Sequence, residues 1–335
     1  MPKLHAFSMS ASFLIRPAAP HDGPSILATF GHVFRDTRSK DVWQWIYRDN
    51  PDGSQSMLCL SGDGDVVAHS GASFHRAVYQ GETVKIGQGR DSFSHPKFRS
   101  VMRGRAGLFA QTAQSLFMQH GLTDGIAFYY GFPSSRAWRL GSTLLDYRKG
   151  SNWGRFYYDM RAQWPDYSTH YGTLAATCEF GAAFDRLWHR RENHVQAAVI
   201  HDSRFLAWRF PAHLKNSYWV WTFTPHLGKE ITGYVIFSRR GHTAMLLDLH
   251  LPDKSRPCFD FWRQIADKLR WHGIGRIETW LSLNHPDLTK LHEIGFNPCP
   301  LPDDVKLGFR VFDGGPDWAL LNQSFCFTMA DSDLY

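Results

Sequence analysis

The sequence predicts an α+β fold made of two tandem domains, each a mixed, largely antiparallel sheet flanked by helices. Three observations support this prediction. The chain has 335 residues, more than one compact domain usually contains. Short β-rich runs separated by turn residues alternate with amphipathic helical segments, as in α+β proteins. The order of these segments in the first half recurs in the second half, which indicates a duplication.

The composition is that of an ordinary globular protein. Hydrophobic residues make up 43% of the chain and charged residues 20%, which argues against disorder. The net charge of +6 is spread without long Lys/Arg runs, so we expect no nucleic-acid partner. No segment approaches the ~18 uninterrupted apolar residues of a membrane span. The five cysteines lack CxxC spacing, which favours the cytoplasm, and the absence of an HExxH pattern predicts no metal.

The first half opens with a strand over 13–16 and a helix over 22–34, where Asp22 and Pro24 are typical of a helix start. Three β-rich runs follow, separated by the turn residues GDGD and QGE. Such turns favour neighbouring antiparallel strands. We therefore expect an antiparallel meander, with strands over 56–61, 65–79 and 83–93.

A helix follows the meander. Phe109, Ala113 and Phe117 recur at four-residue spacing, which predicts one apolar helix face that Gly121 ends. A buried strand is then expected over 126–132, and a short helix follows with a serine as its N-cap.

The second half repeats this order. We expect three strands over 217–223, 231–238 and 243–251, a helix with Phe261, Ile265 and Leu269 on one face, a strand over 276–283 and a short helix over 285–295. A similar aromatic patch precedes each meander, at 41–51 and 202–213. The predicted domains are 1–165 and 190–335, with a linker over 166–189.

The stretch before the helix at 108 is rich in arginine and glycine. A loop that runs into a helix start directs several backbone N–H groups at one point, where the helix dipole favours an anion. Gly104 and Gly107 allow a close approach, and Arg99, Arg103 and Arg105 supply charge for phosphate oxygens. Neither a P-loop nor a GxGxxG pattern is present. An exposed basic helix cap is the alternative.

These residues resemble a known family. The sequence HPKFRSVMRGRAGLF, from His95 to Phe109, is similar to the HPxYRGxGLF loop of the GNAT superfamily of N-acetyltransferases. FLIRPAAPHDGPSILATF and YYGFPSSRAWRLG also look like GNAT segments. The resemblance covers about 13–150; the second half is similar by element order, as in the tandem GNAT arrangement of some bacterial acetyltransferases.

The resemblance implies an acetyl-CoA-dependent N-acetyltransferase, in which an amine attacks the thioester directly. It implies that the pantetheine arm of acetyl-CoA, or of another acyl-CoA, lies between 91–94 and 126–132. The loop is longer than usual by SVMRG, which leaves open which arginine contacts the pyrophosphate. The expected cofactor-binding residues are Phe93, Ser94, Arg99, Arg103, Gly104, Arg105, Ala106, Gly107, Phe132 and Ser134.

The resemblance also suggests which residues move protons. Asp91, just before the loop, is the expected base; a carboxylate that only orients Arg90 or Arg99 is the alternative. His95 is a second choice for the base, or a structural corner. The tyrosine of the family's YxxxGF pattern is replaced by Ala137, so Tyr130 is the expected acid, with Tyr129, Ser134 or an unassisted thiolate as alternatives.

The chain end is a further catalytic candidate. Some tandem GNAT enzymes bring it into the active site, which would give the terminal carboxylate of Tyr335 a role; a frayed end is the alternative. The second half has no phosphate loop, so we expect it to shape the site for a small-molecule or amino-sugar amine. Other readings are a different donor (a longer acyl-CoA, an acyl carrier protein or an aminoacyl-tRNA) and a binding module without turnover. The oligomeric state is left open.

Overall fold

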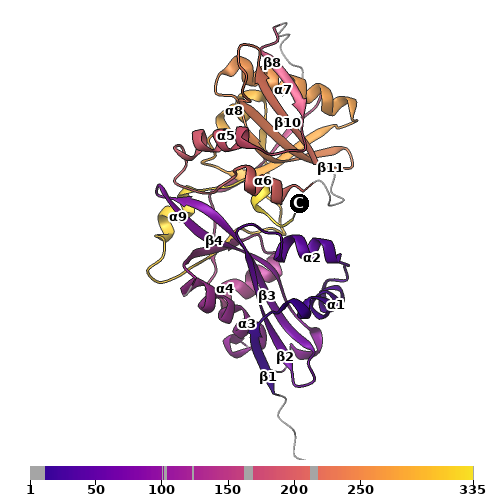
Figure 1. Ribbon diagram of the computed structural model, residues 1–335, viewed down its shortest axis with the longest axis vertical. Helices are drawn as coiled ribbons and strands as arrows, with labels where there is room; N and C mark the ends of the chain where they lie inside the picture. Colours follow the sequence, from indigo (N-terminus) through magenta and orange to yellow (C-terminus); the bar gives the residue numbers. More distant parts are fainter. Residues whose placement is uncertain are drawn as a thin grey trace, which may run out of the picture. The chain divides into compact units, whose positions relative to one another are not determined.

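The computed structural model of the protein (Figure 1) describes residues 12–99, 101, 104–122, 124–161, 169–211 and 218–334. Arg103 and Tyr335, two of the predicted site residues, lie outside these ranges. The chain forms two compact units, which do not follow the chain in simple order. Unit 1 comprises residues 1–74, 87–126 and 140–146, and unit 2 comprises 75–86, 127–139 and 147–335.

The first sheet contains every strand predicted for the first half. Its strand order is β1-β2-β3-β4-β5-β15-β6, and β9 pairs with the end of β3 and with β16. β1 pairs with β2, and β2 pairs with β3, both in antiparallel orientation. The strands are β1 (Phe13–Pro17), β2 (Ser54–Ser61), β3 (Val66–Tyr79), β4 (Glu82–Ser94), β5 (Ile126–Gly131), β6 (Arg148–Lys149), β9 (Ala197–Val199), β15 (Gly308–Val311) and β16 (Phe325–Cys326).

Helices cover both faces of the sheet within unit 1. Figure 1 shows α1 (Gly23–Phe34) and α2 (Lys40–Tyr47) on one side of β1 to β3, and α3 (Leu108–Phe117) on the other. Side chains of β2 alternate accordingly: Leu58 packs in a cluster with residues of α1, and Cys59 packs in a cluster with Leu108 of α3. The predicted helix continues past α3 as a π-turn, η4 (Met118–Leu122).

The second sheet has the strand order β14-β7-β13-β12-β11-β10-β8. Its central strands are those predicted for the second half. The strands are β7 (Trp153–Asp159), β8 (Gly172–Ala176), β10 (Tyr218–Pro225), β11 (Gly233–Arg240), β12 (Thr243–His250), β13 (Arg276–Ser282) and β14 (Asn297–Cys299).

The two halves exchange one strand each. β7 follows the first half in the chain, yet it lies between β13 and β14 of the second sheet, antiparallel to both. In return β15, from the end of the second half, lies between β5 and β6 of the first sheet. Each sheet therefore needs both halves of the chain for completion.

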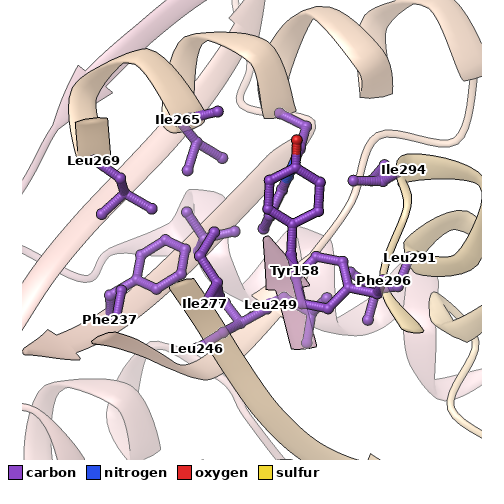
Figure 2. Close-up of a cluster of buried hydrophobic side chains, with 14 of the residues drawn as sticks. Tyr158, Phe237, Leu246, Leu249, Ile265, Leu269, Ile277, Leu291, Ile294 and Phe296 are labelled. Atoms are coloured by element: carbon purple, nitrogen blue, oxygen red, sulfur yellow. The ribbon is translucent and has the colours of Figure 1, made fainter. Parts of the chain in front are cut away.

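The core of unit 2 contains residues of this exchanged strand. Figure 2 shows Tyr158 of β7 among apolar side chains of the second sheet, with Ile265 and Leu269 of α7 (Ser255–Trp271) nearby. Tyr158 packs against Phe296 with ring centroids 5.6 Å apart. The predicted apolar face of α7 is confirmed, since Phe261, Ile265 and Leu269 are all buried.

The remaining helices are α4 (Ser135–Leu144), α5 (Ala182–Glu192), α6 (Ser203–Arg209), α8 (Leu288–Ile294) and α9 (Trp318–Ser324). The two aromatic patches form helices at equivalent places, α2 before β2 and α6 before β10. The stretch 166–189, assigned to a linker from the sequence, contains β8 and the first turns of α5. β8 pairs with β10 as β1 pairs with β2, so it is the first strand of the second repeat.

Across the residues that the structure describes, no helix combines the length and the apolar character needed to cross a bilayer.

Candidate active site

The predicted phosphate-binding turn lies at the start of α3. Gly104 begins a single 3-10 turn, η3 (Gly104–Ala106), and its φ of +66° is a conformation that glycine adopts easily. Gly107 is the N-cap of α3 and caps it with no side chain. The first bond of this helix joins the Gln111 N–H to the Gly107 carbonyl (2.9 Å). The amides of residues 108–110 thus precede the helical ladder and are available to an anion.

Two predicted arginines have protein partners beside this turn. The Arg99 guanidinium donates from Nε and Nη2 to the Ser94 carbonyl (3.2 and 3.0 Å), which folds the loop back onto the end of β4. Arg105 pairs with Asp146 at 2.7 Å on the surface. This hydrogen bond raises the pKa of Arg105, which therefore stays cationic. Arg99 and Arg105 thus place two cationic groups beside the turn, one of them paired with Asp146.

Asp91 has an unusual backbone conformation within β4. Its φ is +48°, in the left-handed region that costs most non-glycine residues about 1 kcal/mol or more. The side chain is 8% exposed and forms an ion pair with Arg38. Tyr47 of α2 donates from its hydroxyl to Asp91 Oδ2 (3.0 Å). Asp91 pairs with neither Arg90 nor Arg99 in these contacts; its cation is Arg38, which sequence reasoning missed.

A histidine completes this group. His69 Nδ1 lies 2.7 Å from the Asp91 carbonyl, which can only accept, so Nδ1 carries the proton. Burial lowers the pKa of His69, which keeps the ring neutral. Among the described residues its buried Nε2 has no hydrogen-bond partner. We call Arg38, Tyr47, His69 and Asp91 the β4 polar cluster.

Glycine makes room for this cluster. A Cβ on Gly71 would overlap the Tyr47 hydroxyl and lie 3.1 Å from His69 Cε1. Burial, together with the Asp91 charge, raises the pKa of Tyr47 well above its usual value, so the phenol stays protonated as a donor. Any side chain at position 71 would therefore push Tyr47 away from Asp91.

Other predicted site residues are largely packed in the interior. Phe93 contacts Phe30 and Phe34 of α1 in unit 1. In unit 2, Phe132 packs on Trp280 (5.4 Å between ring centroids), and Tyr130 packs on Phe325 (5.2 Å). Ser134 caps α4, where its Oγ accepts from the Ala137 N–H (3.4 Å). The side chains of Phe93 and Phe132 thus serve the core, which leaves their main chain for a ligand.

His95 has a structural role. Its N–H donates to the Val67 carbonyl (2.8 Å), and its ring stacks on His32 with centroids 4.9 Å apart. Its Nδ1 accepts from the Lys97 N–H (3.2 Å), which caps the turn η2 (Pro96–Phe98). These contacts favour a structural role for His95 at a loop corner over a role as catalytic base.

The second half has an aspartate on its own fourth strand. Asp248 of β12 is fully buried, and Tyr234 donates to its Oδ2 (2.8 Å). His201 Nδ1 lies 3.1 Å from the same oxygen, and His201 Nε2 lies 3.0 Å from Asp331. Burial alone would lower the pKa of His201, but the two carboxylates raise it to about 10. His201 is therefore a buried imidazolium between two carboxylates.

The helix of the second half starts differently. α7 follows Lys254 and has no side-chain cap, and no glycine lies in its first turn. Asp260 in this helix accepts from the N–H groups of Tyr171 and Gly172 (2.7 and 3.2 Å) and thereby fastens the start of β8. Asp260 of α7 thus binds the protein's own backbone.

Apart from Asp91, the residues of these two polar groups were not identified from the sequence, although signals were present. His69 and Asp248 are polar residues inside strands that are buried along most of their length, and a buried polar group needs partners. The partners Arg38, Tyr47 and His201 come from distant segments, so the sequence could not identify them. Within the described ranges, no group of three or more His, Cys, Asp or Glu residues is arranged to hold a metal ion.

Comparison with known proteins extends this picture. No protein-family profile and no curated sequence matches the chain. Among solved structures, it is similar to a conserved protein of unknown function from Enterococcus faecalis, described as a probable N-acyltransferase. The TM-score is 0.67 at 13% identity, covering 90% of this chain and 73% of that one.

Two further structures are similar over nearly the whole chain. A GCN5-related N-acetyltransferase from Kribbella flavida has a TM-score of 0.65 at 13% identity, covering 91% of this chain and 72% of that one. N-myristoyltransferase from Saccharomyces cerevisiae, with bound myristoyl-CoA, has a TM-score of 0.56 at 12% identity, covering 93% and 85%. At such identities the likeness concerns the fold.

Proposed function

We propose that this chain, which has the GNAT fold in a tandem arrangement, is an acyl-CoA-dependent N-acyltransferase with acetyl-CoA as its donor. The observation that carries the proposal is the start of α3, where Gly104 and Gly107 precede uncapped amides in a basic turn. The similar structures include N-acetyltransferases and one enzyme with a bound acyl-CoA. An acyl-CoA is therefore the donor class that fits both observations.

The residues of the turn suit a diphosphate. The position of a Cβ on Gly104 has no neighbour within 4 Å, so a ligand can approach the backbone there. In the proposal the amides that follow Gly107 bind the pyrophosphate, and Ala106 belongs to the same turn. Arg105 turns from Asp146 toward the phosphates, and Arg99 and Arg103 add charge. The main chain of Phe93, Ser94, Phe132 and Ser134 is proposed to bind the pantetheine arm.

The β4 polar cluster is proposed to receive the acceptor amine. Arg38 and Tyr47 both bind the Asp91 side chain, and a carboxylate attracts an ammonium group and can take its proton. The reaction is then direct attack of the amine on the thioester carbonyl, with both substrates held together. Tyr130 remains the proposed acid for the departing thiolate.

Cofactor binding tests the turn. Gly104→Asp places a carboxylate beside the phosphates, and we expect CoA affinity, measured by calorimetry, to fall at least about tenfold. Gly64→Asp is the matched control, because Gly64 also has a positive φ (+85°) and open space around it. Equal CoA affinity of Gly104→Asp and Gly64→Asp would rule out the proposed phosphate site at this turn.

Turnover tests the reaction class. Release of free CoA from acetyl-CoA, measured with a thiol reagent over a panel of amines and amino sugars, identifies an N-acetyltransferase. If the enzyme turns over only a longer acyl-CoA, an acyl carrier protein or an aminoacyl-tRNA, that compound replaces acetyl-CoA as the assigned donor. Binding of acetyl-CoA without turnover of any donor would instead identify a binding module.

The terminal carboxylate of Tyr335 is proposed as a second proton acceptor. In support, the preceding residue is anchored, since Arg240 donates to the Leu334 carbonyl (3.0 Å). One glycine added after Tyr335 moves the carboxylate by about 3.5 Å. We expect a lower kcat with an unchanged KM for the donor. A chain with an amidated extension of equal length separates the charge from its position.

The acceptor and the compartment complete the proposal. A small-molecule or amino-sugar amine suits the polar cluster on β4, and the second half is proposed to shape its binding site. The proposed compartment is the cytoplasm, and the five free cysteines are in keeping with a reducing environment.

A further inference from the structure

The fourth and fifth strands of the second half separate along their length. β12 and β13 pair in parallel only over Thr243–Met245 and Arg276–Glu278. Just beyond this pairing, a side chain continues the contact, since Thr279 Oγ1 donates to the Leu246 carbonyl (2.9 Å). Both strands continue further, β12 to His250 and β13 to Ser282. An opening between two parallel strands exposes main-chain groups, which need other partners.

The end of the chain supplies these partners. Phe327 bonds to Ser282 of β13 twice: the Ser282 N–H donates to the Phe327 carbonyl (3.1 Å), and the Phe327 N–H donates to Ser282 Oγ (3.2 Å). The next residue, Thr328, donates from its hydroxyl to Asp248 Oδ1 of β12 (3.0 Å). Two consecutive residues therefore bridge the two strands.

Asp331 ties the same segment to His201. The Thr328 N–H donates to Asp331 Oδ2 (2.9 Å), which closes the 3-10 turn η5 (Met329–Asp331). Asp331 Oδ1 in turn accepts from His201, whose other nitrogen donates to Asp248. One imidazolium thus joins the chain end to β12. All of these side chains are buried, so the charges strongly stabilise one another.

Arginines hold the last residues. Arg209 of α6 is 1% exposed and donates to the carbonyls of Ala330 (2.7 Å) and Ser332 (3.0 Å). Arg240 of β11 reaches the carbonyl of Leu334. Arginines of α6 and β11 therefore bind alternate carbonyls of the tail, those of residues 330, 332 and 334.

We propose that the opening between β12 and β13 is a binding site for the chain's own C-terminal tail, Phe327–Leu334. In the first half, the proposed function places the thioester arm of the donor between the corresponding strands. The tail thus takes in the second half the position that the donor takes in the first. His201 and Asp331 are positioning residues, which hold the chain end in one place and exclude a second donor.

Hydrogen exchange of the full-length protein tests this site without donor or acceptor, so failure of the catalytic proposal leaves the result unaffected. In the wild type we expect the amides of residues 327–332 to exchange as slowly as those of β11. Asp331→Asn removes the charge facing His201 and should speed exchange in the tail at least tenfold, with β11 unchanged. Asp304→Asn, an exposed carboxylate of the same unit, is the matched control.

A second variant covers the case in which Asp331→Asn loosens the whole unit. Thr328→Val keeps the shape of the side chain and every charge, and removes the hydroxyl that donates to Asp248 and accepts from the Ala330 N–H. We expect faster exchange at residues 327–332 and faster release of the last residues by carboxypeptidase. Tail exchange at the wild-type rate in both variants would overturn the proposal, as would a wild-type tail that the carboxypeptidase removes at once.

Discussion

Asp91 and Asp248 occupy the fourth strand of their respective repeats, yet they have different partners. Asp91 is 8% exposed and is held by Arg38 and Tyr47, which flank or belong to the helix before the meander. Asp248 is fully buried and is bound by Tyr234, His201 and Thr328 of the tail. Each aspartate thus accepts from a tyrosine hydroxyl and contacts a cationic side chain. Only Asp248 also binds the chain end.

The difference shows how duplication can separate two roles. In the first half the carboxylate keeps 8% of its side-chain surface exposed, and the proposed function assigns it to an exchangeable substrate. In the second half the equivalent carboxylate is sealed by two further charges and a permanent peptide segment. A buried ion pair contributes little net stability when it is complete, but breaking it is strongly destabilising. The second site therefore resists opening, as a structural site should.

The largest expected effect is removal of the buried cation. His201→Ala leaves Asp248 and Asp331 without the imidazolium that lies between them, and we expect a loss of about 3–5 kcal/mol in the free energy of unfolding. Arg38→Ala is the matching change in the first half. Since Arg38 is 22% exposed, water can replace it, and we expect a loss of about 1 kcal/mol. Urea unfolding measures both; equal losses would contradict the comparison.

The pH dependence of stability is the next largest effect. The two carboxylates, acting against burial, raise the pKa of His201 from 6.5 to about 10, so its contribution is complete below pH 6.5 and is lost as the pH rises through 10. Burial opposes the ionisation of Asp248, but His201 and Arg191 lower its pKa from 3.8 to about 2. Its contribution is complete above pH 3.8 and is lost as the pH falls through 2.

Thermal unfolding from about pH 2 to about pH 11 measures this dependence. The groups that face His201 are Asp248 and Asp331 by hydrogen bond, and the rings of Trp188 and Phe205 by packing. The alkaline loss should disappear in His201→Ala. An alkaline slope that persists in this variant would assign the effect to another group.

A smaller effect is expected at Gly71. Gly71→Ala places a methyl group against the Tyr47 hydroxyl, and overpacking of this kind costs about 1–3 kcal/mol. Tyr47→Phe in the same chain removes the hydroxyl, so the double variant should lose less than the sum of the single losses. Gly275→Ala, at a glycine with no neighbour within 4 Å, is the control and should be neutral. Additive losses would argue against the contact.

The smallest stability effect is expected at Arg105. Its ion pair with Asp146 is exposed, so Arg105→Ala should leave the free energy of unfolding unchanged while CoA affinity falls about tenfold. Arg161→Ala removes a similar exposed pair, with Asp159, and should change neither quantity. A stability loss in Arg105→Ala without a loss of affinity would favour the simple helix cap.

Local patterns in the sequence predicted the elements well. The helix at α3 follows from its four-residue apolar spacing, and the meanders follow from β-rich runs between turn residues, because these preferences act over a few neighbouring positions. The strand exchange was beyond this reasoning. The local sequence of β7 is compatible with a strand of either sheet. Only the long-range packing of Phe156 and Tyr158 in the core of unit 2 decides which sheet it joins.

The same distinction applies to the site. By itself, the sequence determined the fold class, the repeat and the basic turn before α3, since glycine, arginine and helix periodicity act within one short segment. Only the tertiary structure decided that Arg38, Tyr47 and His69 surround Asp91, and that His201 joins Asp248 to the chain end. The physical reason is that charges and buried polar groups choose partners by distance in space, and that distance exists only after the chain has folded.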